Sequence, residues 1–252
     1  MHGLQRASMW KRISAWLFDL IITCTVVAGF AFLISLAFGY DSHIEALEQK
    51  YRDYETEYGI SLEIEAEEYE ALTEEQKAKY EIADKAFSED AEAQQIYYQI
   101  FNLTLITVIF SVLFGMLLME FILPLIFGNG QTLGKKIFGI GVMRVDSVKI
   151  NPAVLLIRTL LGKYTIETML PLLLLMMIFF GLIGIGGTLL ICLILLTNIV
   201  MMCATVTNSA IHDMLANTVT VDIASQMIFD TEEEMLAYKQ RMHEEAMRAE
   251  RY

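Results

Sequence analysis

A long apolar segment with one acidic residue near its start constrains the fold of this chain more than any other feature. Residues 16–38 contain a single charged side chain, Asp19. A helix rises about 1.5 Å per residue, so this segment is long enough to cross a hydrocarbon core of about 30 Å. A carboxylate in that position costs roughly 2.5–3.5 kcal/mol on insertion scales. We therefore expect a membrane-spanning helix, with polar groups from later in the chain compensating Asp19.

The net charge of −13 belongs to one segment of the chain. Residues 41–92 contain 18 acidic and 5 basic side chains, and the remainder is neutral. No basic surface is spread out to neutralise phosphates, which argues against nucleic acid as a partner. The cysteines Cys24, Cys192 and Cys203 lie in apolar segments without CxxC spacing. We interpret them as packing residues and expect no metal site and no cofactor.

Basic residues precede the first apolar segment. Arg6, Lys11 and Arg12 place the N-terminus in the cytoplasm by the positive-inside rule. The segment is too long for the core of a cleaved signal, and we interpret it as a retained signal anchor that ends near Gly39.

The acidic segment that follows, residues 40–96, has a helical pattern. Aromatic and aliphatic residues recur every three or four positions up to Gly59, and Thr73 with Gln76 forms a capping box before a second stripe. We expect an extracytoplasmic helical hairpin. It is either a solvated acidic cap or a module, residues 41–95, that docks a membrane protein partner or attracts cations.

A second span is expected over residues 96–127, with small residues along one face that favour close helix contact. Glu120 lies on roughly the opposite face, where it either faces a neighbouring subunit or reaches the membrane interface. Residues 128–150 are basic and rich in glycine, which indicates a cytoplasmic elbow at the lipid headgroups.

Another helix starts at Asn151-Pro152, where Asn is a good N-cap and Pro a good first residue. We expect an amphipathic helix to about Thr165, either lying at the cytoplasmic surface or dipping into the membrane, with Lys163 and Glu167 paired four residues apart. Residues 169–206 carry no charge and are broken by the sequence GLIGIGG. This pattern favours a hairpin of two spans, and hence four spans rather than three.

Polar residues on the last span and beyond it supply the expected surroundings of Asp19. Asn198, Thr205 and His212 follow one another at seven-residue steps, so they lie near one face of a helix. The C-terminal residues, 223–252, predict a cytoplasmic amphipathic helix that begins after Thr231 and serves packing or dimerisation.

Three charged positions and the segment between them resemble the RDD family of prokaryotic membrane proteins, which is named for one arginine and two aspartates. Arg12 opens the first span, Asp19 lies seven residues deeper, and Asp213 follows the last span in HDMLANTVTV. The sequence QTLGKKIFGIGVMRVD and Arg158 lie between them. The resemblance covers about residues 1–39 and 97–222. It implies a multi-pass membrane protein, mostly of unassigned function, with ion–proton antiport proposed for some members.

Side-chain direction separates the roles of the two aspartates. Helical side chains lean toward the N-terminus, so Arg12 points away from Asp19 and toward the cytoplasmic interface. We expect Arg12 to meet Asp213. Asp19 is then either paired with Arg158, hydrogen-bonded to the polar groups of Asn198 or Thr205, or protonated. The network is either a polar clasp that holds the helices together or a route for a proton or cation.

Two functions remain open. One is cation/proton transport with Asp19 as the coupling group, which in a chain of four spans favours a homo-oligomer. The alternative is a non-transporting accessory or scaffold protein that binds or regulates a membrane partner. An enzyme is not expected, because the adjacent pair His212-Asp213 has no matching nucleophile or metal cluster.

The sequence therefore predicts an all-α integral membrane protein in the cell membrane, with four spans and both termini in the cytoplasm. Its parts are a lead and first span (1–39), an acidic extracytoplasmic insert (40–96), the remaining membrane domain (97–222) and a C-terminal helix (223–252).

Overall fold

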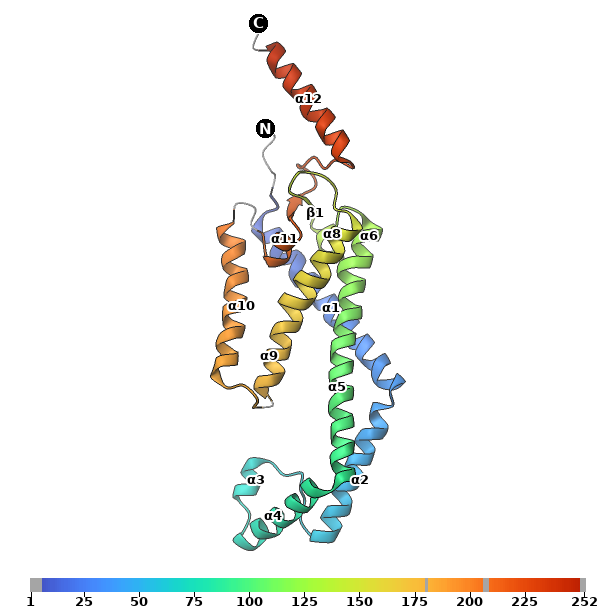
Figure 1. Ribbon diagram of the computed structural model, residues 1–252, viewed down its shortest axis with the longest axis vertical. Helices are drawn as coiled ribbons and strands as arrows, with labels where there is room; N and C mark the ends of the chain where they lie inside the picture. The colour runs from blue at the N-terminus through green and yellow to red at the C-terminus, as the bar shows by residue number, and fades with distance from the viewer. Residues whose placement is uncertain (1–5, 180, 206–208, 250–252) are drawn as a thin grey trace. The chain divides into compact units, whose positions relative to one another are not determined.

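The computed structural model describes residues 6–179, 181–205 and 209–249. The chain is mostly helical (Figure 1). It divides into two compact units, one made of Met1–Val27 and Val112–Tyr252 and the other of Ala28–Ser111. The boundaries fall inside two long helices, whereas composition alone had suggested boundaries at the ends of the acidic insert.

Three helical segments in the described residues are long and apolar enough to cross a membrane. The first is α1 (Met9–Ala37); the second joins α5 (Ala91–Leu117), η1 (Leu118–Ile122) and α6 (Leu123–Phe127); the third joins α8 (Pro152–Ile157), η2 (Arg158–Met169) and α9 (Leu170–Phe179). The segments η1 and η2 are π-helical. The third segment is continuous from Pro152 to Phe179, so the expected separate surface helix ending near Thr165 is wrong.

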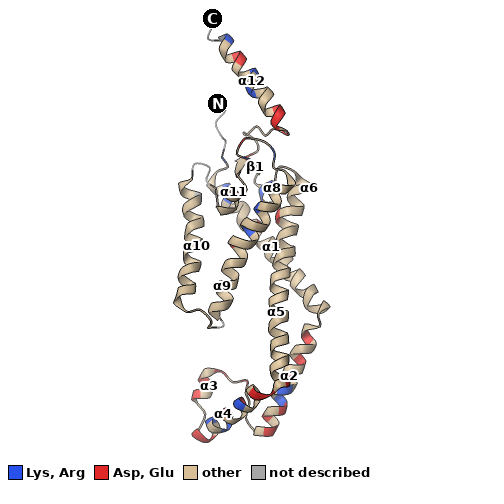
Figure 2. Ribbon diagram, in the orientation of Figure 1, with Lys and Arg blue, Asp and Glu red and all other residues tan. Residues whose placement is uncertain are grey.

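A shorter apolar helix, α10 (Ile185–Ala204), follows the third segment and packs against α9. Residues of the predicted glycine-rich break separate the two helices, and Gly181 has a φ of 68°. Such a left-handed conformation is one that glycine adopts without steric cost. Figure 2 shows that neither α9 nor α10 carries a charged residue. The predicted break is therefore present, and it produces a helical hairpin.

The acidic insert contains α2 (Tyr40–Tyr58), α3 (Ala66–Glu70) and α4 (Glu74–Glu89). The first of these ends where the sequence predicted, at Gly59, whose φ of 67° closes the helix. Thr73 caps α4, and the predicted capping box with Gln76 is formed in both directions. Local signals thus placed both helix ends correctly.

The insert has a small aromatic core of its own. The rings of Tyr51 and Phe87 stack with centroids 4.7 Å apart, and Tyr54 meets Phe87 edge to face at 5.4 Å. Asp90 accepts hydrogen bonds from Lys50 and from the Tyr54 hydroxyl, both at 3.2 Å. The tyrosine stripe of α2 therefore packs against α4, and the acidic side chains of these two helices are mostly exposed.

The prediction of an all-α fold is wrong in one respect. Strands β1 (Ile140–Arg144) and β2 (Thr218–Asp222) form an antiparallel sheet in which Val142 pairs with Thr220. The N-terminal lead joins its edge, because the Ala7 N–H donates to the Thr220 carbonyl at 3.3 Å. Residues 145–217 separate the two strands in the sequence and contain a whole helical hairpin. No local turn signal could therefore predict the pairing.

Three further short or terminal helices complete the chain: α7 (Leu133–Ile137), α11 (Ile211–Leu215) and α12 (Glu232–Ala249). Thr132 caps α7, and Thr231 caps α12 by accepting from the Glu234 N–H at 3.2 Å. The predicted start of the C-terminal helix is therefore confirmed. The helices α7 and α11 adjoin the two strands and carry side chains of the buried site.

Candidate functional site

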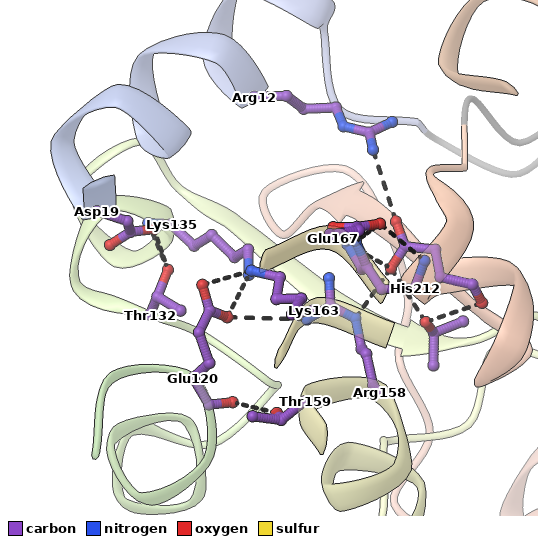
Figure 3. Close-up of polar contacts among 12 residues, drawn as sticks. Arg12, Asp19, Glu120, Thr132, Lys135, Arg158, Thr159, Lys163, Glu167 and His212 are labelled. Carbon is purple, nitrogen blue, oxygen red and sulfur yellow. Dashed lines mark hydrogen bonds and ion pairs between the residues drawn. The ribbon is translucent and has the colours of Figure 1, made fainter. Parts of the chain in front are cut away.

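Charged side chains gather inside the unit that holds both strands (Figure 3). They come from α1, from the second and third long segments, and from the short helices α7 and α11. The cluster contains four carboxylates, four basic side chains and a histidine: Asp19, Glu120, Glu167 and Asp213; Arg12, Lys135, Arg158 and Lys163; and His212. Burying so many charges is costly and is tolerated only when each one has a partner. Their pairing therefore defines the site.

Asp19, in α1, is 6% exposed and contacts the start of α7. Its carboxylate accepts hydrogen bonds from the Thr132 hydroxyl and from the Gly134 N–H, the latter at 2.7 Å. Both donors are neutral, and the N–H is one that the first turn of a helix leaves without an internal acceptor. Asp19 thus holds the elbow after the second segment against the first span.

Gly134 makes this contact possible. A Cβ at position 134 would overlap the carbonyl oxygen of Ala15 and lie 3.0 Å from the carboxyl carbon of Asp19. The glycine of the QTLGKK segment is therefore needed for the close approach of α7 to α1.

Arg158 and Asp213 form the most deeply buried ion pair among the described residues. Arg158 is 1% exposed and Asp213 is 0% exposed, and the arginine Nε donates to Oδ1 at 2.9 Å. The Thr218 hydroxyl donates to the same oxygen at 3.1 Å. Arg12 Nη2 lies 3.6 Å from Asp213 Oδ2, which is the contact expected between these two residues from the sequence. One aspartate therefore joins α1, η2 and β2.

Glu120, 6% exposed, is the centre of a second group of charges. Lys163 donates to its Oε1, while Lys135 Nζ and Arg158 Nη1 lie 3.8 and 4.0 Å from its Oε2. The interpretation of Glu120 as an interfacial or subunit-facing residue is therefore wrong. The expected pair of Lys163 with Glu167 is wrong as well, because Glu120 competes successfully for the lysine.

Glu167 instead binds His212. Both oxygens of Glu167 lie 2.8 Å from His212 Nδ1, and Oε1 also accepts a hydrogen bond from the backbone N–H of His212 at 3.1 Å. Gly162 lies under this contact, and a Cβ there would overlap the Cβ of His212. The absence of a side chain at position 162 lets α11 pack directly on η2.

Prolines explain why the two glutamates lie in π-helical turns. Pro124 and Pro171 have no N–H, so the carbonyls four residues earlier, those of Glu120 and Glu167, lose their usual helical donors. The Thr159 hydroxyl replaces one of them by donating to the Glu120 carbonyl at 2.9 Å. π-helical turns are frequent at functional sites. Each buried glutamate is thus presented by a distorted turn that its own sequence produces.

Three members of the cluster that lie outside the long apolar segments have shifted pKa values: Asp213, Lys135 and His212. Burial raises the pKa of Asp213, but the charges of Arg158, His212 and Arg12 together with the hydrogen bond from Arg158 outweigh it, and the pKa lies well below its usual range. Burial lowers the pKa of Lys135 to about 7, although Glu120 opposes the shift. Burial also lowers the pKa of His212, which favours the neutral imidazole at neutral pH. Lys135 is therefore the side chain of this group whose charge changes most readily near neutrality.

Three buried atoms of the cluster have no hydrogen-bond partner among the described residues. They are Glu120 Oε2, Lys135 Nζ and Asp213 Oδ2. Each belongs to an ion pair longer than a hydrogen bond, since the distances to the opposite charges are 3.6 Å or more. The charges are balanced, but the local bonding is incomplete.

The polar face predicted on the last span does not reach Asp19. Asn198 bonds within its own helix, to the Ile194 carbonyl, and accepts from the Ile211 N–H at 3.5 Å. Thr205 donates to the Met201 carbonyl and accepts from the Ser209 N–H. These two residues close the end of α10. The expectation that Arg158, Asn198 or Thr205 compensates Asp19 is therefore wrong, and Thr132 and Gly134 take that role.

Sequence reasoning missed the part played by Glu120, Lys135 and Thr132. One signal for Glu120 was present, because it lies four residues before the proline of an otherwise apolar helix. No signal in the sequence distinguished Lys135 from the adjacent Lys136, because the two side chains are chemically identical. In the structure Lys136 is exposed and lies against the Phe127 ring. No group of three or more His, Cys, Asp or Glu side chains in the described part of the chain is arranged to hold a metal ion.

Long apolar helices joined by a buried charge cluster define a multi-pass membrane protein. The RDD family model matches residues 6–217 of this chain, which is most of its length, and the chain belongs to the RDD family. The match extends from the N-terminal lead across the first aspartate to the end of α11, so it includes all members of the charge cluster. Neither a curated protein nor a solved structure matches the chain.

Proposed function

We propose that this protein exchanges protons for cations across the membrane, and that Asp19 supplies negative charge for which proton and cation compete. The observation that carries the proposal is the buried cluster itself: four carboxylates, four basic groups and a histidine, contributed by three helical segments long enough to span a bilayer and by the short helices α7 and α11. Ionisable side chains inside membrane segments are costly, and they commonly mark the paths of protons and ions.

The bonding of Asp19 supports this role. Its hydrogen bonds from Thr132 and Gly134 come from neutral donors, which orient the carboxylate without neutralising its charge. Glu120 and Asp213 each keep one oxygen without a hydrogen bond. A buried cluster with oxygens still free to bond favours the entry of water or a small cation over a purely structural clasp.

Four spans with both termini in the cytoplasm fit the contacts of the site. The N-terminal lead, the elbow 128–150 and residues 209–222 contribute to one sheet and its surroundings, so all three lie on the same side. The chain must therefore cross the membrane an even number of times between the lead and the elbow, and again between the elbow and residues 209–222. The helix α10 has 20 residues and is therefore long enough, at about 1.5 Å per residue, to supply the fourth crossing. The basic residues of the elbow favour the cytoplasmic side.

Single cysteines labelled with a membrane-impermeant maleimide test this topology. The native Cys24, Cys192 and Cys203 are first replaced by Ser. Glu67→Cys in the insert is expected to react in intact cells, whereas Lys149→Cys is expected to react only after the cells are opened. Labelling of the Lys149 position in intact cells would contradict the orientation.

Reconstituted vesicles test the transport itself. Proteoliposomes with an internal pH dye are challenged with Na⁺, K⁺ or Li⁺, and the wild-type chain is expected to move protons in the opposite direction. Asp19→Asn removes the charge and should abolish the exchange, whereas Asp230→Asn, at an exposed aspartate, should leave it unchanged. Absence of flux in the wild-type vesicles with all three cations would overturn the proposal.

A second candidate is an accessory protein that binds a membrane partner through the insert 41–95. The specific observation is that the insert has its own aromatic core, and that the acidic residues concentrated along α2 and α4 are mostly exposed. Replacing residues 41–89 with a short flexible linker separates the candidates. Transport should survive this change, whereas an accessory protein should lose its partner in affinity purification while the membrane domain remains folded.

A further inference from the structure

Lys135 lies where four charged side chains from three other elements converge. Its ammonium faces Glu120 from η1, Lys163 and Arg158 from η2, and Asp19 from α1. The residue is 8% exposed, and in Figure 3 its side chain extends from the side of Asp19 toward Glu120. An ammonium is thus buried between two carboxylates and two other cations.

The contact between Lys135 and Glu120 is not a hydrogen bond. Nζ and Oε2 are 3.8 Å apart, and neither atom has a hydrogen-bond partner in the described chain. A buried lysine that donates no hydrogen bond is held only by the longer-range attraction of the carboxylates. Such a group is easily displaced, because little directional bonding is lost when it leaves.

The charge balance of the cluster depends on Lys135. The four carboxylates and four basic side chains cancel when Lys135 is protonated and His212 is neutral. Loss of the Lys135 proton leaves one uncompensated negative charge, and a single monovalent cation restores the balance. The lowered pKa of Lys135, about 7, permits this loss near neutral pH.

We propose that the ammonium of Lys135 is the resident counter-ion of Glu120 and Asp19, and that a monovalent cation binds beside these carboxylates in exchange for the lysine proton. This inference rests on the proposed cation/proton exchange and names the group that carries its proton. The N–H bond of the ammonium breaks, the proton leaves to water, and the neutral amine keeps its electron pair. One positive charge enters for each one that leaves, so the exchange is electroneutral.

Proton release on cation binding tests the inference without any transport. The full-length chain in detergent, in weak buffer with a pH dye, receives NaCl, KCl or LiCl, with choline chloride at the same ionic strength as the control. We expect about one proton released per chain with at least one of the three metal cations, as charge balance requires. Release should vanish as the pH rises past about 7, because the lysine has then already lost its proton.

Substitutions assign the release to Lys135. Lys135→Arg keeps the positive charge permanently, so it should abolish both proton release and cation binding. Lys135→Met should bind the cation without releasing a proton. Lys136→Gln is the matched control, because this neighbouring lysine is exposed and lies 4.1 Å from the centre of the Phe127 ring. Thermal melting curves establish that each variant is folded, and the pH dependence of the wild type stands without any variant.

The outcomes separate this inference from the proposed function. No proton release from the wild type with any of the three cations, or unchanged release in Lys135→Arg, overturns the inference. Flux in vesicles that survives Lys135→Arg also overturns it, while cation/proton exchange through the protein still stands. Release that depends on Lys135, with no flux in vesicles, supports the cation site and overturns transport.

Discussion

Arg158 donates a hydrogen bond from Nε to Asp213 Oδ1 at 2.9 Å, and both side chains are almost fully excluded from the surface. The pair joins a π-helical turn of the third long segment to the short helix α11. Arg158 also lies 4.0 Å from Glu120, so a single guanidinium connects the carboxylates of two separate groups of charges. Its loss should affect both groups.

We expect Arg158→Gln and Asp213→Asn each to lower the free energy of unfolding by about 3–5 kcal/mol, because each leaves a buried charge without its partner. Lys11→Gln, which removes the partly exposed pair with Asp222, serves as the control and should cost at most about 1 kcal/mol. Denaturation of the detergent-solubilised chain measures the differences. Equal effects at the buried and exposed pairs would contradict the assigned roles.

Acid should destabilise the protein through Asp213. Its pKa is held below the usual value by Arg158, His212 and Arg12 together, against the effect of burial. Its stabilising contribution is therefore complete above the pKa of an unfolded aspartate, about 3.9, and is lost as the pH falls from there toward the folded value. The melting temperature of the wild type should therefore fall steeply below about pH 4. Asp213→Asn should show a shallower decline, and an identical decline would exclude Asp213 as its source.

Gly134→Ala should disrupt the contact between α7 and α1, because the added methyl would overlap the Ala15 carbonyl and approach Asp19. We expect a loss of about 1–3 kcal/mol, typical of overpacking. Gly29→Ala is the matched control in a helix, since no atom lies within 4 Å of the added Cβ, and it should be neutral or slightly stabilising. A tolerated alanine at position 134 would show that this close approach is not required.

Asp19 and Thr132 should be energetically coupled. The Thr132 hydroxyl donates to the Asp19 carboxylate, so Asp19→Asn and Thr132→Val together should cost less than the sum of the single changes, by about 0.5–3 kcal/mol. Thr197→Val provides the comparison, because its hydroxyl bonds the Leu193 carbonyl within α10. Unfolding measurements on the four members of the cycle give the coupling, and additivity would exclude a direct interaction.

Local signals in the sequence were sufficient for many of the helix ends. Asn151 caps its helix by accepting from the Val154 N–H at 2.8 Å, Gly59 closes α2, and Thr73 begins α4. These features depend on residues three or four positions apart, and such interactions form wherever the chain is helical. The long apolar segments can likewise be recognised from their own length and composition, without knowing what they pack against.

The partners of the buried charges depended on contacts between distant parts of the chain. The sequence paired Lys163 with Glu167 by their spacing, but Glu120 lies closer to Lys163 once the second and third long segments pack together. Asp19 likewise accepts hydrogen bonds from Thr132 and Gly134, more than 110 positions away, and not from the polar face of the last span.

By itself, the sequence determined that this protein has long apolar helices, an acidic insert and a family-defining set of Arg12, Asp19 and Asp213, because hydropathy, net charge and motif order are properties of the chain alone. Only the tertiary structure decided which charges neutralise one another and that Lys135 rather than Lys136 is buried. A charged side chain away from water binds whichever opposite charge the packing of helices brings within a few ångströms, and spacing along one helix does not reveal that distance.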